Sequence, residues 1–256
     1  MCIAYLSLGH PGWPVLIAAN RDEFHARPAS PAGPWPGRPD VVAGRDLDAG
    51  GTWLGCGPDG RYALLTNYRE PGFSAPAGAP SRGTLVRDYL LGETGAAEYG
   101  ETIARQSRRW AGFNLILGTP GESWYVGNRN PSPAPRRLEP GTHVLSNHLL
   151  NTPWPKTQRL REALDALPPE SWMPEPDRVF ALLRDTTPAP EAELPRTGLS
   201  PAREKLLSSP FIVSPEYGTR CSTVIAIGAD RRVLLSEQSY GPDGQPTERH
   251  DWRLPR

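Results

Sequence analysis

Cysteine, net charge and long apolar runs are all scarce in this 256-residue sequence. Three cysteines, at positions 2, 56 and 221, are an odd number, which leaves at least one thiol free and favours a reducing compartment. The 28 basic and 28 acidic side chains balance, so no basic field would attract nucleic acid. No stretch approaches the ~20 consecutive apolar residues of a membrane span, and the start lacks the regions of a signal peptide. These absences predict a cytoplasmic protein without a nucleic-acid partner or a membrane span.

Proline is abundant instead, with 31 residues that divide the chain. They gather in segments 28–40, 71–80 and 131–140, where a helix or a central strand cannot continue. The chain is long enough for one substantial core, and its proline-rich segments show no repeat, so we expect a single domain over residues 1–256. Loops 28–40, 68–82 and 128–140 should shape any pocket.

Short apolar segments on either side of turn residues predict β-hairpins. The expected strand pairs are 2–8 with 15–20, 52–56 with 61–67, 113–118 with 123–128, and 222–228 with 232–239, and a lone strand is expected at 142–147. Helical periodicity is present over 82–108, with a break near Gly92, and over 156–167 and 177–184. Hairpins at both ends with helices between them predict an α+β fold: a four-layer αββα sandwich of two stacked antiparallel sheets flanked by helices.

Polar residues follow three of the apolar strands, and a cysteine begins the first. Because paired residues of a hairpin have numbers with a constant sum, a turn centred near residue 11 or 12 places Cys2 opposite about residue 21. The cluster 20–23, Asn-Arg-Asp-Glu, therefore lies beside the thiol. Two further strands end in Asn67 and Asn147. This convergence indicates an active-site edge.

Removal of the initiator methionine would give Cys2 both a thiol and a free α-amine. With ordinary pKa values of ~8.5 and ~7.7–8.0, nucleophile and base then reside on one residue. Asp22 can hold the ammonium or the thiol, and Arg21 can stabilise the thiolate. Asn67 or Asn147 can donate to the oxyanion of a tetrahedral intermediate. This set predicts N-terminal-nucleophile chemistry.

Each of these residues also has a structural interpretation. A cysteine at the start of a strand is most often a small buried apolar residue. Asp22 and Glu23 can be solvated turn residues, and Asn67 and Asn147 can begin loops, because asparagine tolerates left-handed backbone. Taken separately these interpretations are sufficient, but they do not account for three strands that end in the same chemistry.

Ordered motifs along almost the whole chain resemble the NRDE family, also called the transport and Golgi organisation two family. The motifs are Cys2, Asn20-Arg21-Asp22-Glu23-Phe24, Arg27-Pro28, Gly50-Gly51-Thr52-Trp53-Leu54-Gly55, Leu65-Thr66-Asn67-Tyr68-Arg69, Leu145-Ser146-Asn147, Trp154-Pro155-Lys156 and Tyr217-Gly218-Thr219-Arg220. That family is similar in turn to the N-terminal-nucleophile (Ntn) hydrolases of the penicillin V acylase and bile-salt hydrolase group. The resemblance implies the sandwich fold and cleavage of amides by an N-terminal cysteine.

By the same likeness, individual positions acquire roles. Cys2 matches the nucleophile, Asp22 the carboxylate near the α-amine, Asn67 and Asn147 the two asparagines, and Arg220 a late-chain arginine. One departure concerns the acylase order Arg-Asn-x-Asp, because Ala19 stands where the arginine is expected and Arg21 comes two positions later. A shift of two residues along a strand keeps the same face, so Arg21 can take the arginine's place.

Two classes of function are compatible with these residues. The first is hydrolysis of a linear amide or acyl compound through an acyl-enzyme on Cys2, with no cofactor. The second, implied by the family, is a non-catalytic protein that binds and traffics haem, lipid or acyl-CoA, with Cys2, His25 and His148 as candidate haem ligands. The ligand is thus a small amide, acyl or haem-like molecule. Histidine and cysteine spacing predicts no metal site, and the sequence sets no oligomeric state.

Overall fold

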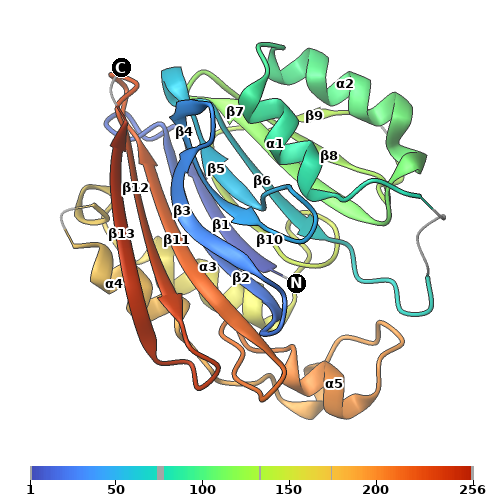
Figure 1. Ribbon diagram of the computed structural model, residues 1–256. Coiled ribbons are helices and arrows are strands. Elements are labelled where there is room, and N and C mark those ends of the chain that lie inside the picture. The colour runs from blue at the N-terminus through green and yellow to red at the C-terminus, as the bar shows by residue number, and fades with distance from the viewer. Residues whose placement is uncertain (1, 74–77, 133, 174, 255–256) are drawn as a thin grey trace.

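The protein folds into two stacked antiparallel sheets with helices on both outer faces (Figure 1). A computed structural model describes residues 2–73, 78–132, 134–173 and 175–254. The strands are β1 Cys2–Leu8, β2 Val15–Phe24, β3 Ala29–Trp35, β4 Arg38–Asp46, β5 Leu54–Cys56, β6 Tyr62–Asn67, β7 Phe113–Thr119, β8 Glu122–Gly127, β9 Arg136–Arg137, β10 Gly141–Leu145, β11 Tyr217–Ile227, β12 Val233–Tyr240 and β13 Pro246–Leu254. The helices are α1 Gly83–Leu91, α2 Ala96–Gln106, α3 Pro155–Asp165, α4 Pro176–Leu183 and α5 Pro201–Leu206.

The six-stranded sheet has the order β10-β1-β2-β11-β12-β13, and the seven-stranded sheet has the order β3-β4-β5-β6-β7-β8-β9. Side chains alternate across each strand, so each sheet has two apolar faces. Leu6 and Ile17 of the first sheet meet Leu64 and Ile116 of the second in the central core. Burial of this interface holds the two sheets together.

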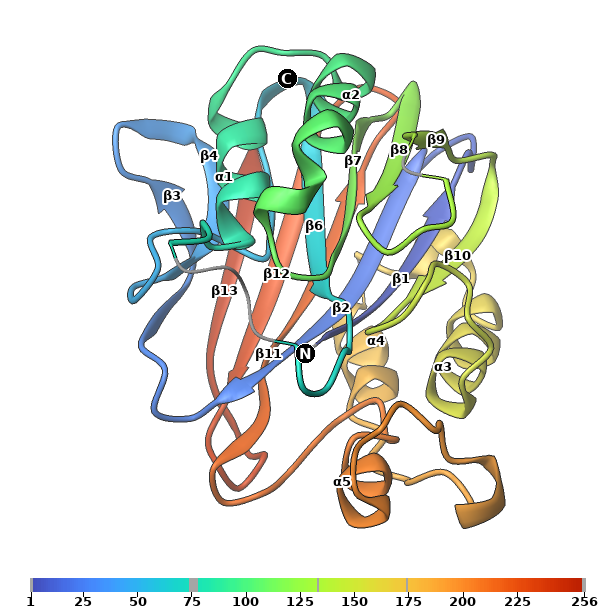
Figure 2. The same ribbon diagram turned by 90° about the vertical axis from the view of Figure 1, so that its right-hand side faces the viewer.

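Helices cover the outer face of each sheet, as Figure 2 shows from the side. Leu85 of α1 and Ile103 of α2 pack against Leu115 on the seven-stranded sheet. Leu160 of α3 and Val179 of α4 pack in the same way on the six-stranded sheet. The predicted αββα sandwich of two stacked antiparallel sheets flanked by helices is therefore confirmed.

All four predicted hairpins are present, as are the lone strand and the predicted helices. The break near Gly92 separates α1 from α2. In the first hairpin Cys2 is the partner of Arg21, as the hairpin arithmetic predicted. Strand β2 runs on to Phe24, so the polar cluster 20–23 forms the last part of the strand and does not follow it.

The prediction that segment 28–40 is a loop was wrong. Most of it forms β3 and the start of β4. The strand tolerates Pro31 and Pro34 because β3 lies at the edge of its sheet, and its pairing with β4 shifts register twice. The rest of β4, strands β9 and β13 and the short helix α5 were also not predicted. None of the helices that the structure describes is long and apolar enough to cross a membrane.

Candidate active site

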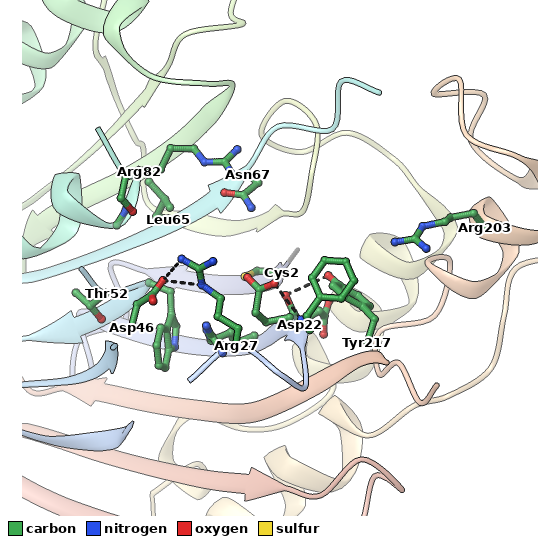
Figure 3. A pocket seen from close by; sticks show the side chains of 16 residues that line it. Cys2, Asp22, Arg27, Asp46, Thr52, Leu65, Asn67, Arg82, Arg203 and Tyr217 are labelled. Atoms are coloured by element: carbon green, nitrogen blue, oxygen red, sulfur yellow. Dashed lines mark hydrogen bonds and ion pairs between the residues drawn. The ribbon is translucent and has the colours of Figure 1, made fainter. Parts of the chain in front are cut away.

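A cavity of about 420 Å³ opens at the end of the sandwich where β1 begins (Figure 3). Four of the six predicted site residues line it: Cys2, Arg21, Asp22 and Asn67. They come from β1, β2 and β6, so both sheets contribute. In Figure 3, Asn67 lies on the wall opposite Cys2 and Asp22. The predicted convergence of strand ends is thus present for these four residues.

Cys2 begins β1 and is partly exposed. The hydroxyl of Ser146, which follows β10, donates to the Cys2 carbonyl at 2.9 Å and fixes the strand start. Burial of the sulfur raises the pKa of the Cys2 thiol, and the Asp22 carboxylate raises it further, while the Asp22 N–H and Arg21 lower it. The group is consequently a thiol at neutral pH and needs a base before it can attack.

Arg21 lies directly across the ladder from Cys2 and is only 6% exposed. Its guanidinium stacks over the Trp53 ring, 4.2 Å from the centroid. Arg21 shares the inter-sheet face with Ile17 and the partly buried Ala19, because residues two apart point the same way. Arg21 therefore faces the same side of the sheet as Ala19, where the acylase order has its arginine, and its taking that arginine's place stays a prediction.

Asp22 lies in the same strand on the other face of the sheet and is fully enclosed. The Thr219 hydroxyl donates to its Oδ1 at 2.7 Å, and the Tyr217 hydroxyl donates to its backbone carbonyl at 3.1 Å. Burial raises the pKa of the Asp22 carboxyl, and the nearby Lys156 ammonium and the Thr219 hydrogen bond oppose that rise. The strand ladder therefore separates this carboxylate from the Arg21 guanidinium.

The two predicted asparagines have different surroundings. Asn67 ends β6, is half-buried and lines the cavity. Asn147 is 0% exposed, is absent from the cavity lining, and donates its side-chain N–H to the Asn67 carbonyl at 2.9 Å. Thr66 Oγ1 also donates to the Ser146 carbonyl at 2.6 Å. The Leu-Thr-Asn and Leu-Ser-Asn motifs therefore bind each other, and Asn147 positions Asn67 where a second oxyanion donor was expected.

Arg220 is not brought into the cavity, contrary to the expectation from the resemblance. A β-bulge between Thr219 and Cys221 takes Arg220 out of the ladder with β2. Its guanidinium instead donates to the carbonyls of Phe24 and His25, at 3.0 and 3.1 Å. In this structure Arg220 secures the turn after β2.

Several cavity residues were not predicted. Arg27 forms an ion pair with Asp46 at 2.9 Å, and Arg82 donates to the Gly112 carbonyl at 3.1 Å. Arg203, at the start of α5, reaches toward the cavity from the side (Figure 3). Arg27 belongs to a motif already singled out, whereas Arg82 and Arg203 gave no sequence signal. Of the three predicted pocket loops, 68–82 contributes Ser81 and Arg82, and its residues 74–77 lie outside the described residues. The described residues of segments 28–40 and 128–140 do not line this cavity.

The Gly-Gly-Thr motif supports the cavity wall. Gly50 has a φ of +68°, which favours glycine, and a Cβ on Gly51 would lie 2.5 Å from the Gly83 carbonyl carbon. The Thr52 N–H donates to the Gly83 carbonyl at 3.1 Å. The backbones of the Gly-Gly-Thr motif and of the start of α1 therefore approach closely beside the site.

Buried charges behind Asp22 also escaped prediction. Lys156 is 2% exposed and donates from Nζ to the Leu207 carbonyl at 2.9 Å. Arg69 pairs with Glu204 at 2.7 Å, with both side chains 4% exposed. Lys156 and Arg69 belong to motifs quoted above, but a sequence does not show that a charged residue is buried.

The candidate haem ligands do not gather in the cavity. His25 contacts the Ser214 carbonyl at 3.0 Å, and His148 contacts the Thr152 hydroxyl at 2.9 Å. Neither histidine lines the cavity with Cys2. Within the described part of the chain, no group of three or more histidine, cysteine, aspartate or glutamate residues could hold a metal ion.

Comparison with known proteins gives consistent results for family and fold. Residues 1–242 match the model of the family Transport and Golgi organisation 2. The chain is 34% identical to a Transport and Golgi organization protein 2 homolog of Bos taurus, over 99% of each chain, and 33% identical to the homolog of Homo sapiens, over 93% of each. Among solved structures, the Caenorhabditis elegans ortholog of N-acylethanolamine-hydrolyzing acid amidase superposes with a TM-score of 0.51 at 12% identity, covering 88% of this chain and 92% of that one. At that identity the likeness concerns the fold.

Proposed function

This chain belongs to the Transport and Golgi organisation 2 family, and from the geometry of its cavity we propose that it hydrolyses a linear amide or acyl compound with Cys2 as nucleophile. The observation that carries the proposal is the pairing of Cys2 with Arg21 in a cavity that Asp22 and Asn67 also line. The fold is shared with an amidase that hydrolyses N-acylethanolamines. Cytoplasmic location remains our expectation.

The reaction begins after removal of Met1, which gives Cys2 a free α-amine. The amine accepts the thiol proton while the sulfur attacks the amide carbonyl, so that a C–S bond forms and the carbonyl oxygen becomes an oxyanion. Collapse of this intermediate breaks the C–N bond, and the ammonium gives its proton to the leaving amine. Water then attacks the thioester, releasing the carboxylic acid and restoring the thiol.

Each neighbouring residue has a task in this sequence. The Asn67 side chain lines the cavity without a hydrogen bond to the described residues, so its N–H can stabilise the oxyanion. The Asp22 carboxylate orients the α-ammonium. Because the thiol pKa is raised by burial, the α-amine must act as base within the attack itself.

An acyl probe tests this mechanism directly. Protein beginning at Cys2 is incubated with a panel of activated acyl esters and acyl amides, and intact mass is measured over time. We expect one acyl adduct that hydroxylamine releases, since a thioester is the intermediate. Cys2→Ala should form no adduct, while Cys56→Ala should behave like the wild type because Cys56 is buried.

A second comparison isolates the α-amine. Protein that retains Met1 keeps the thiol but lacks the amine on Cys2, and should lose at least about 100-fold in acylation rate, the range of general base catalysis. Asn67→Leu should lose about 10²–10³-fold, the usual effect of removing one oxyanion donor. Equal acylation of the wild type and Cys2→Ala would contradict the proposal that Cys2 is the nucleophile.

A further inference from the structure

The cavity around Cys2 contains more positive charge than its own acids neutralise. Four arginines line it, at positions 21, 27, 82 and 203, against acids at 22, 23 and 46. Arg27 is neutralised by Asp46 at 2.9 Å and by Asp48 at 3.2 Å. Asp22 faces the buried Lys156 on the far side of the sheet. Arg21, Arg82 and Arg203 then remain, with Glu23 as the one acid opposing them among the described residues of the lining.

Arg21 differs from Arg82 and Arg203 in its surroundings. Its side chain is 94% removed from solvent, yet among the described residues no carboxylate lies within 4.0 Å of the guanidinium and no acceptor receives its hydrogen bonds. Its described partner is the face of Trp53. A buried charge without a partner costs several kcal/mol of folding free energy. An anion that binds from outside would supply the missing partner of the Arg21 guanidinium.

Arg82 faces the same cavity from the segment before α1. One of its nitrogens donates to the Gly112 carbonyl, and no carboxylate of the described chain lies within 4.0 Å. Burial lowers the pKa of Arg82, which Glu23, Glu70 and Cys2 raise. The remaining nitrogens can form a forked pair with a planar anion. Figure 3 places Arg82 on the wall across from Cys2.

The space on the core side of Cys2 does not offer an alternative position for the substrate. That space measures about 10 Å³ and is enclosed by apolar side chains such as Ala4, Leu54 and Leu64. It is about the volume that one water molecule requires. Both sides of a scissile amide bound at Cys2 must therefore extend into the arginine-lined cavity.

We propose that Arg21 and Arg82 bind a negatively charged group of the substrate, so that the enzyme acts on acyl amides with a carboxylate or a phosphate close to the scissile bond. This inference rests on the proposed function for its substrate, but the anion site itself stands on two arginines that have no carboxylate partner among the described residues. Arg203, exposed at the mouth, draws the same charge toward the cavity.

Two alkylating reagents of nearly equal size test the anion site without any turnover. Iodoacetate and iodoacetamide both attach to a thiolate, and they differ in charge. The quantity compared is the iodoacetate rate divided by the iodoacetamide rate. We expect this ratio at Cys2 to exceed the ratio for N-acetylcysteine by about tenfold, a modest charge–charge effect at partly buried sites. Arg82→Gln and Arg21→Gln should each return the ratio most of the way to that of N-acetylcysteine. A change in thiol pKa or accessibility alters both rates together and leaves the ratio unchanged.

Arg105→Gln serves as the matched control, because Arg105 lies on α2 outside the cavity and contacts Thr102 and Glu101 of its own helix. Its ratio should equal that of the wild type. A wild-type ratio equal to that of N-acetylcysteine, or one that neither cavity variant changes, overturns the anion site. A circular dichroism spectrum and the resistance of the buried Cys56 and Cys221 to iodoacetamide verify that each variant is folded.

A substrate panel separates this inference from the function on which it rests. N-hexanoylglycine, N-hexanoylglycinamide and N-hexanoyl-O-phosphoethanolamine are compared by kcat/KM. Preference for the carboxylate or the phosphate over the neutral amide by tenfold or more supports the inference and identifies the anion. Equal hydrolysis of all three overturns it while the proposed function stands. No hydrolysis of any amide, with the alkylation ratio intact, contradicts the function and leaves the anion site.

Discussion

Replacing Lys156 with methionine tests the electrostatics behind the site. The ammonium is buried beneath the sheet, and burial lowers its pKa from the ordinary 10.5 to about 8, an effect that Asp22 partly opposes. One pH unit of displacement corresponds to about 1.4 kcal/mol, so charging Lys156 in the folded protein costs about 3 kcal/mol more than in the unfolded chain. Methionine has a similar length and no charge, so Lys156→Met removes this cost.

The sign of the effect follows from proton counting. Below pH 8 the lysine is charged in both states, and the folded protein bears the full cost. Between pH 8 and 10.5 the folded protein releases the Lys156 proton while the unfolded chain keeps it. The contribution of Lys156 to the free energy of unfolding therefore rises with pH. We therefore expect the wild type to gain about 3 kcal/mol of unfolding free energy relative to Lys156→Met between pH 7.5 and 10.5. Groups that do not interact with Lys156 titrate alike in both proteins and cancel in the difference.

At pH 7 the variant should be close to the wild type in stability or above it. The lost bond from Nζ to the Leu207 carbonyl is worth about 1 kcal/mol, less than the burial cost that disappears. Reactivity should nevertheless fall, because the pKa of Asp22 rises further without the neighbouring cation. A more stable but less reactive variant is the expected outcome.

Urea unfolding at a series of pH values measures the difference. The chain has one other lysine, Lys205, which is exposed on α5, so Lys205→Met is the matched control. Two lysines also give two side-chain resonances after ¹³Cε labelling, and Lys156→Met assigns them. If the stability difference stayed constant from pH 7.5 to 10.5, or if the Lys156 resonance titrated near 10.5, our account of the buried ammonium would be refuted.

Three further substitutions test other parts of the structure. Arg69→Met leaves Glu204 buried without its cation and should cost about 3–5 kcal/mol in urea unfolding, whereas adding Glu204→Gln should recover most of the loss. Gly51→Ala places a Cβ 2.5 Å from the Gly83 carbonyl carbon at the start of α1, and should cost about 1–3 kcal/mol and slow Cys2 alkylation. Thr219→Val removes the hydroxyl that bonds Asp22 at 2.7 Å, which should raise the pKa of Asp22 and move the acidic limb of the activity profile to higher pH.

Elements with strong local signals could be predicted from the sequence. Apolar segments flanked by turn residues identified the hairpins, and their numbers gave the pairing of Cys2 with Arg21. The edge strand β3 could not be predicted, because proline is excluded from central strands but permitted at an edge, and edge position is a property of the whole sheet. Strand β13 consists mostly of exposed residues and shows no apolar alternation.

The sequence predicted those parts of the site whose positions follow from strand pairing and the stacking of the two sheets. Cys2, Arg21, Asp22 and Asn67 reach one cavity because strand pairing and the stacking of the two sheets bring them there. The prediction for Arg220 was wrong because of a single β-bulge, which takes the residue out of the ladder with β2 and leaves no mark in the residue pattern. Arg82 and Arg203 belong to segments whose paths depend on tertiary packing, so their contribution was visible only in the folded protein.

The position of the nucleophile at the start of β1 has a physical reason within the proposed mechanism. Side chains in β2 alternate, so Arg21 lies on the inter-sheet face, whereas Asp22 and its partner Thr219 lie on the helix-covered face. The side chain of a cysteine in the middle of a strand would point to one face of the sheet only. The backbone N–H of that cysteine would form a hydrogen bond within the ladder. A residue at the free start of the strand can direct its thiol toward Arg21 and its amine toward Asp22. Substitutions on the two faces should therefore separate: Arg21 variants change the preference for anionic reagents, and Asp22 or Thr219 variants change the pH dependence.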